Sequence, residues 1–318
     1  MSLSGELEII HLQGEVPEAL SGQRLDAALA RMFPSYSRSR IQQWMEAGWV
    51  RVDGETPRRR DTALGGARVV IEARVEAASE DRAEDIPLEV IYEDDSLLVI
   101  NKPPGLVTHP AAGNREGTLV NALLHHAPDL AALPRAGIVH RLDKETSGLL
   151  VVARTLEAHT DLVRQLQART VGREYLALVQ GVIVAGGTVD APIGRHPVDR
   201  KRMAVVAGGK EAITHYRVEA RFPHHTLLRV RLETGRTHQI RVHMAHIHHP
   251  IVGDPVYGGR LKVPAGLSEA EQAVLRGFRR QALHAARLEL VHPVTGEEMG
   301  WEAPMPEDMA RLLRSLEG

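Results

Sequence analysis

The chain has 318 residues, 43% of them hydrophobic, which suffices for about two domains that each bury a core. It contains no cysteine, which excludes disulfide bonds, thiolate metal sites and cysteine nucleophiles. The formal net charge is -2, and neither a basic leader nor a run of ~20 apolar residues is present, so we expect a cytoplasmic protein without a membrane anchor.

Charge is distributed unevenly along the chain. Residues 76 to 85 hold five acidic residues and one arginine without large apolar groups, which is typical of a solvated linker. Residues 190 to 243 hold eleven Lys or Arg and five Asp or Glu, a net charge of +6. We therefore predict an N-terminal extension (1–17), a small domain (18–75), an acidic linker (76–86) and a second domain (87–318).

The small domain is predicted to contain two helices followed by two strands. RLDAALARMF has apolar residues at helical spacing. SRSRIQQWMEAGWV is a second helix, with Ser37 or Ser39 as its N-cap and Gly48 at its C-terminal end. VRVDGE is a strand that enters an Asp53-Gly54 turn, and ARVVIEA is another strand.

This order of elements, over residues 18 to 72, resembles the αL RNA-binding module of a small-subunit ribosomal protein and of several RNA-modifying enzymes. Arg38 and Arg40 open the second helix, where backbone amides also point outward, and this combination suits RNA phosphates. The arginine run at residues 58 to 60, taken alone, is more often a solvated loop.

In the second domain, strands and helices alternate without a parallel βαβ rhythm, which predicts an α+β fold. Strands are expected in LEVIYE, LLVINKP, LLVVAR, REYLALVQG, ITHYRVEAR and LLRVRLETG. Helices are expected in TLVNALLHHA, with Thr118 at its head, and in TLEAHTDLVRQLQ. GRTHQIRVHMAHI is predicted to be an amphipathic helix with Ile240, Met244 and Ile247 as its apolar stripe.

The segment HRLDKETSG, residues 140 to 148, places several ionisable side chains between two apolar runs. Asp143 could simply cap a turn, and from these nine residues that explanation is as good as a catalytic carboxylate. Three other stretches favour a site, and one of them, LHAARLELVHPVTGE (283–297), supplies an apolar wall and a turn. TGRTHQIR places Arg236 at a junction of strand and helix, and REYLALV places Tyr175 early in a strand, although such a tyrosine alone is more often part of a core.

Together these stretches resemble the RluA-type family of pseudouridine synthases, especially its RluD-like members with an N-terminal αL module. The residues that carry the resemblance are VINKPPGLVTHP, GIVHRLDKETSGLLVVAR, REYLALV, PIGRHPVDRKRMAV, TGRTHQIRVHMAHIHHPIVGDPVYG and LHAARLELVHPVTGE. The resemblance implies a pseudouridine synthase domain built on a mixed, mainly antiparallel sheet flanked by helices. Arg173, where a lysine is frequent, is a small departure.

The resemblance also implies roles for individual residues. Asp143 matches the essential aspartate, which either attacks C1′ or removes a sugar proton, and Arg236 matches the basic residue paired with it. Tyr175 matches the tyrosine that stacks on uracil and whose hydroxyl could take part in C5 deprotonation. Arg141 matches a residue that fills the space left by the flipped nucleotide. Leu283 matches the apolar wall under the base.

The substrate expected from the resemblance is structured RNA, most specifically a stem-loop of large-subunit ribosomal RNA or a ribosomal precursor particle. The isomerisation neither gains atoms nor changes redox state, so we expect no cofactor and no metal. The same chemistry on transfer RNA or at another ribosomal RNA site is an alternative. A non-catalytic RNA-binding assembly factor is another, against which the set of Asp143, Tyr175 and Arg236 argues.

Histidines near these motifs allow a competing interpretation. His140 and His238 are expected to orient the backbone or to bind phosphate rather than to transfer protons. The segment HMAHIHH could suggest a metal site, but its histidines lack the i, i+4 spacing and the intervening glutamate of zinc hydrolases, and Pro250 ends the helix. We therefore do not expect metal catalysis.

Overall fold

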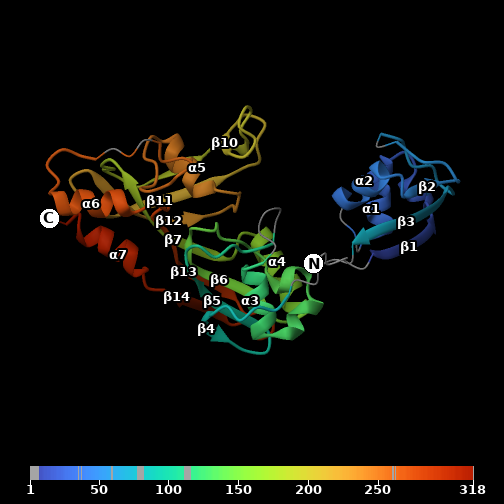
Figure 1. Cartoon of the computed structure of the whole chain (residues 1–318), viewed down its shortest axis with the longest axis horizontal. Helices are drawn as coiled ribbons and strands as arrows, with labels where there is room; N and C mark the ends of the chain where they lie inside the picture. Colours follow the sequence, from blue (N-terminus) through green and yellow to red (C-terminus); the bar gives the residue numbers. More distant parts are fainter. Residues whose placement is uncertain are drawn as a thin grey trace, which may run out of the picture. The chain divides into compact units, whose positions relative to one another are not determined.

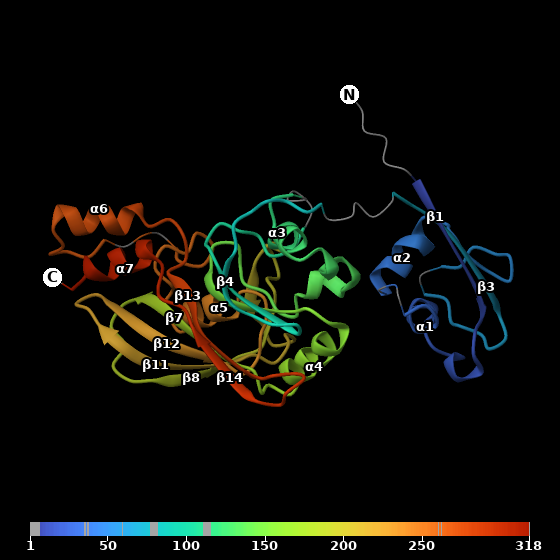
Figure 2. The same ribbon diagram turned by 90° about the horizontal axis from the view of Figure 1, so that it is seen from below.

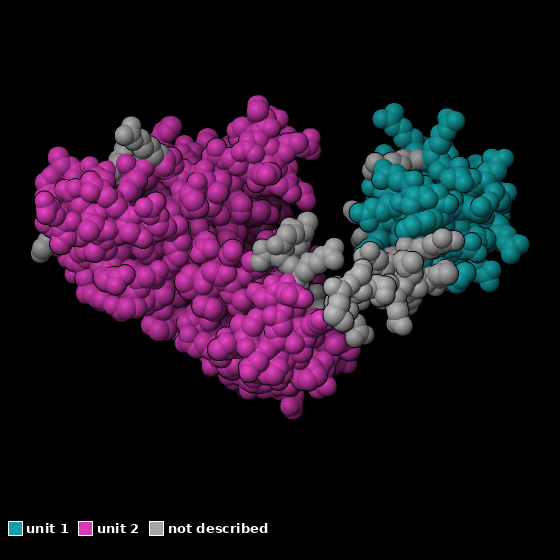
Figure 3. Space-filling view, in the orientation of Figure 1, with its two compact units in different colours: residues 1–80 teal, residues 81–318 magenta. Residues whose placement is uncertain are grey.

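The structure, a computed structural model, describes residues 7–34, 36, 38–58, 60–76, 82–110, 116–259, 261 and 263–317. The chain divides into two compact units, residues 1–80 and residues 81–318, which Figure 3 shows in different colours. In these described ranges, no helix is long and apolar enough to cross a membrane. The expected N-cap Ser37 lies outside them, as does the side chain of Ser39.

Unit 1 combines a short antiparallel sheet with two helices. Its elements are β1 (Leu7–Glu15), η1 (Glu18–Leu20), α1 (Leu25–Met32), α2 (Arg38–Glu46), β2 (Val50–Val52) and β3 (Arg68–Glu76), with the strands in the order β1-β3-β2. Asp53 and Gly54 both have positive φ, so the expected turn is present. The sequence does not predict β1, which pairs with β3 along its whole length.

The core of unit 1 explains why the two helices form. Ile41, Trp44 and Met45 of α2 recur at helical spacing and are buried against Leu25 and Leu29 of α1. The helices therefore cover one face of the small sheet with apolar side chains and leave their arginines outward.

Unit 2 is built on one nine-stranded sheet (Figure 1). Its strand order is β4-β5-β6-β13-β7-β12-β11-β8, with β14 paired to β13, and in this sheet only the short β6–β13 contact is parallel. The strands are β4 (Glu89–Glu93), β5 (Leu97–Lys102), β6 (Ser147–Ala153), β7 (Gly172–Gln180), β8 (Gly187–Asp190), β11 (Ile213–Arg221), β12 (His225–Leu232), β13 (Leu283–Val291) and β14 (Glu298–Glu302). The expected α+β fold with a mixed, mainly antiparallel sheet is confirmed.

Helices and a small hairpin surround this sheet. They are α3 (Leu119–His126), η2 (Pro128–Ala132), η3 (Pro134–Gly137), α4 (Leu156–Gln167), β9 (Ile193–Arg195), β10 (Met203–Val205), α5 (Gln239–His246), α6 (Glu269–Gly277) and α7 (Glu307–Arg314). Thr118 caps α3 as expected, within a reciprocal capping box with Asn121. Figure 2 shows α3 and α4 on opposite sides of the sheet.

Alternation along the central strands gives the sheet a core on each face. In β5, Leu98 and Ile100 pack into the core shared with α3 and α5, whereas Leu97 and Val99 pack into the core shared with α4. Both faces of this strand are therefore buried, which accounts for its nearly continuous apolar sequence. The charged loop that follows η3 lies at the N-terminal end of β6.

Candidate active site

Asp143 lies in the loop at residues 139–146, which the preceding chain holds in place. Thr108 Oγ1 donates to the Leu142 carbonyl oxygen at 2.8 Å, and the backbone N–H of Gly105 donates to the carbonyl oxygen of Lys144 at 2.9 Å. The loop closes as a turn through a bond from the Thr146 amide to the Asp143 carbonyl. The turn is thus made by the backbone, and the Asp143 carboxylate is left for other contacts.

A buried lysine also holds this loop. Lys102 Nζ donates to the carbonyl oxygens of Pro103, Leu106 and Lys144 at 2.8, 3.0 and 3.0 Å. Burial lowers the pKa of Lys102 to about 7, whereas three carbonyl acceptors favour the ammonium form with its three N–H groups. The sequence reasoning missed this lysine, and the signal was a cation at the end of a strand that is otherwise buried.

The start of β6 lies against β13 so closely that only glycine fits. Gly148 has a φ of +115°, and a Cβ there would lie 2.2 Å from the Ala285 carbonyl oxygen. Ser147 Oγ lies 3.0 Å from Nδ1 of the buried His284. Glycine at this position in HRLDKETSG therefore lets the Asp143 loop lie beside Leu283 at the beginning of β13.

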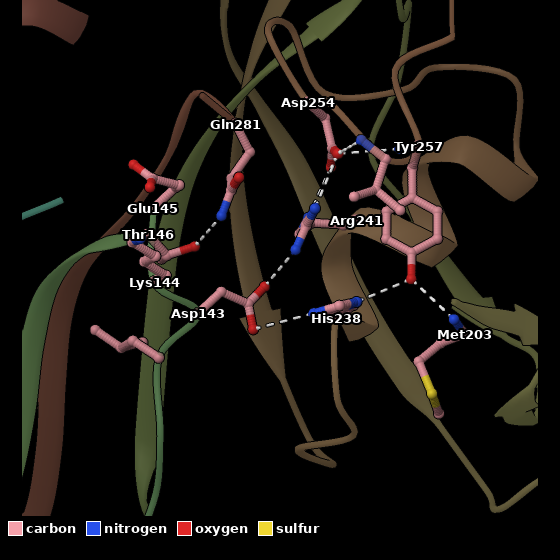
Figure 4. Close-up of polar contacts among 12 residues, drawn as sticks. Asp143, Lys144, Glu145, Thr146, Met203, His238, Arg241, Asp254, Tyr257 and Gln281 are labelled. Atoms are coloured by element: carbon pink, nitrogen blue, oxygen red, sulfur yellow. Dashed lines mark hydrogen bonds and ion pairs between the residues drawn. The ribbon is translucent and has the colours of Figure 1, made fainter. Parts of the chain in front are cut away.

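Asp143 pairs with Arg241, as Figure 4 shows. The expected pairing with Arg236 is wrong. Arg241 Nη1 lies 2.8 Å from Asp143 Oδ2, and the same guanidinium binds both oxygens of the buried Asp254 at 2.7 and 2.9 Å. Arg236 instead donates from Nε to the Glu211 carbonyl oxygen at 2.9 Å. The reason is that α5 begins at Gln239, so Arg241 lies in its first turn and Arg236 precedes it.

Burial and charge set the state of this arginine. Desolvation disfavours the charge on Arg241, but its contacts with Asp254 and Asp143 outweigh this and raise the pKa of the guanidinium. Burial likewise opposes the charge on Asp254, yet bonds from Arg241 lower the pKa of that carboxyl. Arg241 therefore stays cationic beside Asp143 and stabilises negative charge there.

A cavity of about 1050 Å³ opens at this loop and collects the other candidate residues. Asp143, Arg141, Tyr175, Arg236 and Leu283 all line it. So do further cationic or ionisable residues, namely Arg135, His109, His140, Arg169, Arg173, His238 and Arg241. A hollow with this many cations and few acids suits an anionic polymer.

Tyr175 and Leu283 belong to the apolar part of the cavity lining. Tyr175 is in β7, between Val230 of β12 and Ala285 of β13, and Leu283 is the first residue of β13. Both are nearly fully buried, at 6% and 4% exposure. Burial raises the pKa of the Tyr175 hydroxyl, so this group is a neutral phenol near pH 7.

Two residues of the HRLD segment face different environments. Arg141 is exposed at the cavity. His140 accepts a hydrogen bond at Nε2 from the Val151 amide at 3.1 Å, and its buried Nδ1 has no partner among the described residues. Burial, with Arg173 adding to it, lowers the pKa of His140 to about 3. His140 thus orients the backbone of β6 as a neutral ring.

His238 is the second group beside the carboxylate. Its Nε2 lies 3.7 Å from Asp143 Oδ1, and its Nδ1 lies 2.9 Å from the Tyr257 hydroxyl. That hydroxyl accepts a hydrogen bond from the Met203 amide at 3.0 Å. Figure 4 shows this chain of contacts running from Asp143 to β10.

The arginines expected to bind phosphate in unit 1 are both exposed. Arg38 donates from Nε and Nη2 to the buried carboxylate of Asp26 at 3.1 Å each, and Arg24 and Gln42 donate to the same group. These bonds outweigh desolvation and lower the pKa of Asp26 to about 2. Asp26 therefore binds one edge of the Arg38 guanidinium, while about half of the Arg38 side chain stays exposed.

Histidines of the HMAHIHH segment contact different parts of the fold and do not converge on one site. His243 is buried and contacts Thr214 Oγ1 at 2.8 Å and the Ala191 carbonyl at 2.9 Å. His249 contacts the Gln180 carbonyl at 2.8 Å. Among the residues that the structure describes, no group of three His, Cys, Asp or Glu is arranged to hold a metal.

Comparisons with known proteins match both units. Residues 96–246 match the family described as RNA pseudouridylate synthase, and residues 23–57 match the S4 domain. Ribosomal large subunit pseudouridine synthase D of Pseudomonas aeruginosa is 60% identical over 309 residues, covering 97% of each chain. The proteins of that name from Xanthomonas campestris pv. campestris and Escherichia coli (strain K12) are 59% and 56% identical, covering 96% of this chain and 92% and 94% of theirs.

A solved structure is similar as well. Human RNA Pseudouridylate Synthase Domain Containing 4 superposes with a TM-score of 0.56 and 27% identity, covering 72% of this chain and 92% of that one.

Proposed function

The chain belongs to the RNA pseudouridylate synthase family, and from that premise we propose that it converts specific uridines of large-subunit ribosomal RNA to pseudouridine with Asp143 as the catalytic carboxylate. The names of the relatives support this RNA over transfer RNA. Such an enzyme would work in the cytoplasm, on ribosomal RNA or a precursor particle. The observation that carries the assignment of Asp143 is its place in the cavity beside Arg241.

The reaction sets clear demands on the site. The N1–C1′ bond breaks, the uracil turns, C5 joins C1′, and the C5 proton leaves while N1 gains one. A group that is negatively charged and close to the sugar can attack C1′ as a nucleophile or remove a sugar proton as a base. Asp143 could act by either route, because its carboxylate is partly exposed at the cavity and Arg241 binds its Oδ2 atom.

Neighbouring residues would hold the extruded nucleotide. The ring of Tyr175 offers a face for stacking on uracil, and Leu283 offers an apolar wall. The neutral phenol of Tyr175 would bind the base and would serve as a proton acceptor only after losing its own proton. Arg141 is exposed and lines the cavity, and it would fill the space from which the nucleotide was flipped.

RNA binding would draw on both units. The S4 domain carries Arg38 and Arg40 at exposed positions of helix α2. In unit 2, arginines line the cavity on several elements, which suits phosphates on either side of a flipped nucleotide. Arg236 lines the cavity and donates to the Glu211 carbonyl oxygen, so we assign it to RNA contact rather than to the ion pair with Asp143.

The test is Asp143→Asn, measured as pseudouridine formation in a large-subunit ribosomal RNA fragment. We expect the rate to fall by ~10²–10⁴-fold or more, because the amide can act neither as base nor as nucleophile. RNA affinity should change by no more than a few-fold. The fold should survive because Arg241 keeps its two bonds to Asp254.

Asp95→Asn is the matched control, since Asp95 precedes β5 and does not line the cavity. It should retain wild-type activity. A wild-type rate for Asp143→Asn would refute the assignment. RNA binding by the wild-type protein without any pseudouridine formation would instead favour a non-catalytic assembly factor.

A further inference from the structure

His238 has a backbone conformation that calls for an explanation. Its φ is +58°, in the left-handed region that non-glycine residues rarely adopt, and it occupies the N-cap position of α5. Its side chain makes no capping hydrogen bond to the helix. Instead the ring lies between the Asp143 carboxylate and the Tyr257 hydroxyl. Conformations of this kind persist where the surrounding structure fixes them, often at functional sites.

The contacts of the Tyr257 hydroxyl favour one tautomer of His238. The Tyr257 hydroxyl oxygen accepts from the Met203 amide, so its own proton is available for His238 Nδ1. A neutral ring that accepts at Nδ1 carries its proton on Nε2, the nitrogen nearer to Asp143. Burial lowers the pKa of His238, which favours this neutral form.

Tyr257 is itself fixed firmly. Its backbone amide donates to Asp254 Oδ1 at 3.0 Å, the same carboxylate that holds Arg241. Its ring lies 5.1 Å from the Arg241 guanidinium and 5.3 Å from that of Arg202. Arg241 and His238 therefore approach Asp143 from one connected framework, one at Oδ2 and the other at Oδ1.

We propose that His238 is a positioning residue for the isomerisation, which donates from Nε2 to Asp143 Oδ1 in the RNA complex, and that Tyr257 sets the tautomer that makes this possible. The proposal rests on the proposed role of Asp143. The separation of 3.7 Å is too long for a hydrogen bond here, but catalytic hydrogen bonds are often long without substrate and shorten in the complex.

The consequence is a carboxylate that cannot turn about its Cβ–Cγ bond. The single bond from Arg241 to Oδ2 restrains the carboxylate group from one side only. A second donor on Oδ1 fixes the plane of the carboxylate, and orientation of this kind is a large part of catalytic rate. Loss of His238 should therefore lower the rate of the chemical step without weakening RNA binding.

Two substitutions separate the two nitrogens of the ring. The amide nitrogen of glutamine can take the place of Nε2, so His238→Gln keeps a donor toward Asp143. The shorter asparagine reproduces only the contact near Nδ1, so His238→Asn keeps the neighbourhood of Tyr257 and loses the donor. Asparagine also tolerates a positive φ.

The experiment measures single-turnover pseudouridine formation and, separately, the Kd for the same RNA fragment, using the full chain. We expect His238→Asn to lower the rate about tenfold or more with an unchanged Kd, and His238→Gln to stay within about threefold of wild type. Tyr257→Phe should lower the rate by an intermediate factor. His238→Gly should fold as stably as wild type, because glycine suits this φ, and should be as slow as His238→Asn.

His248 provides the matched control. It lies at the other end of α5, is exposed, and also has a positive φ of 64°. His248→Asn and His248→Gln should leave both rate and Kd unchanged. A wild-type rate for His238→Asn, an equal loss in His238→Gln and His238→Asn, or an effect on Kd alone would each overturn the proposal. A wild-type rate for Asp143→Asn would overturn the proposed function itself.

Discussion

Replacing Asp254 with asparagine should destabilise unit 2 much more than replacing Asp143. The side chains of Arg241 and Asp254 are 5% and 0% exposed, whereas that of Asp143 is 16% exposed. Removing one partner of a buried ion pair typically costs ~3–5 kcal/mol. Because Asp143 would remain beside Arg241, we take the lower end, about 3 kcal/mol, for Asp254→Asn. Asp143→Asn leaves the bidentate pair intact and should cost about 1 kcal/mol.

Thermal unfolding of the full chain measures this difference. A domain of the size of unit 2 loses ~2–4 °C per kcal/mol, so Asp254→Asn should lower its melting temperature by roughly 6–12 °C. The pKa of Asp254 is lowered in the folded state, so its contribution is complete above the ordinary carboxyl pKa of ~3.9 and is lost as the pH falls through the folded value. The difference in melting temperature between the wild-type protein and Asp254→Asn should therefore become smaller only at acidic pH. Equal melting temperatures at pH 7 would refute the reasoning.

Two further substitutions test the geometry of the site. Arg241→Lys should lower the rate of pseudouridine formation about 100-fold, because an ammonium group cannot bind Asp254 and Asp143 together as the planar guanidinium does. Arg236→Lys should lower the same rate by no more than about threefold. A larger loss of rate in Arg236→Lys than in Arg241→Lys would restore Arg236 as the partner of Asp143. Gly148→Ala should cost about 3 kcal/mol or more in urea unfolding, because its Cβ would meet the Ala285 carbonyl, while Gly277→Ala, with open space around it, should be nearly neutral. An unchanged midpoint for Gly148→Ala would contradict this close packing.

Local sequence patterns predict much of the fold. Leu25, Ile41 and Trp44 recur at helical spacing and are buried, and Thr118 caps its helix through a capping box, so short-range chemistry was sufficient for these elements. The nearly continuous apolar sequence of β5 likewise reflects burial on both faces. By contrast, β1 owes its existence to pairing with β3, about 60 residues away in the chain, and a local pattern does not report such a partner.

Contacts of the candidate site depend on the tertiary fold and do not follow from local sequence patterns. Arg236 and Arg241 are both in TGRTHQIR, and the sequence predicts one helix through the two. The left-handed backbone of His238 instead ends the preceding loop and starts α5 at Gln239, which aims Arg241 at Asp143. Lys102 was missed for a similar reason, since its three carbonyl partners come from loops brought together only by the tertiary fold.

The most direct measurement maps pseudouridine at nucleotide resolution in the large-subunit ribosomal RNA of cells that lack this gene and carry either the wild-type chain or the Asp143→Asn variant. We predict that particular sites lose pseudouridine in the deletion, regain it with the wild-type chain and stay uridine with the variant at equal protein level. Full modification restored by the Asp143→Asn variant would contradict catalysis by this carboxylate.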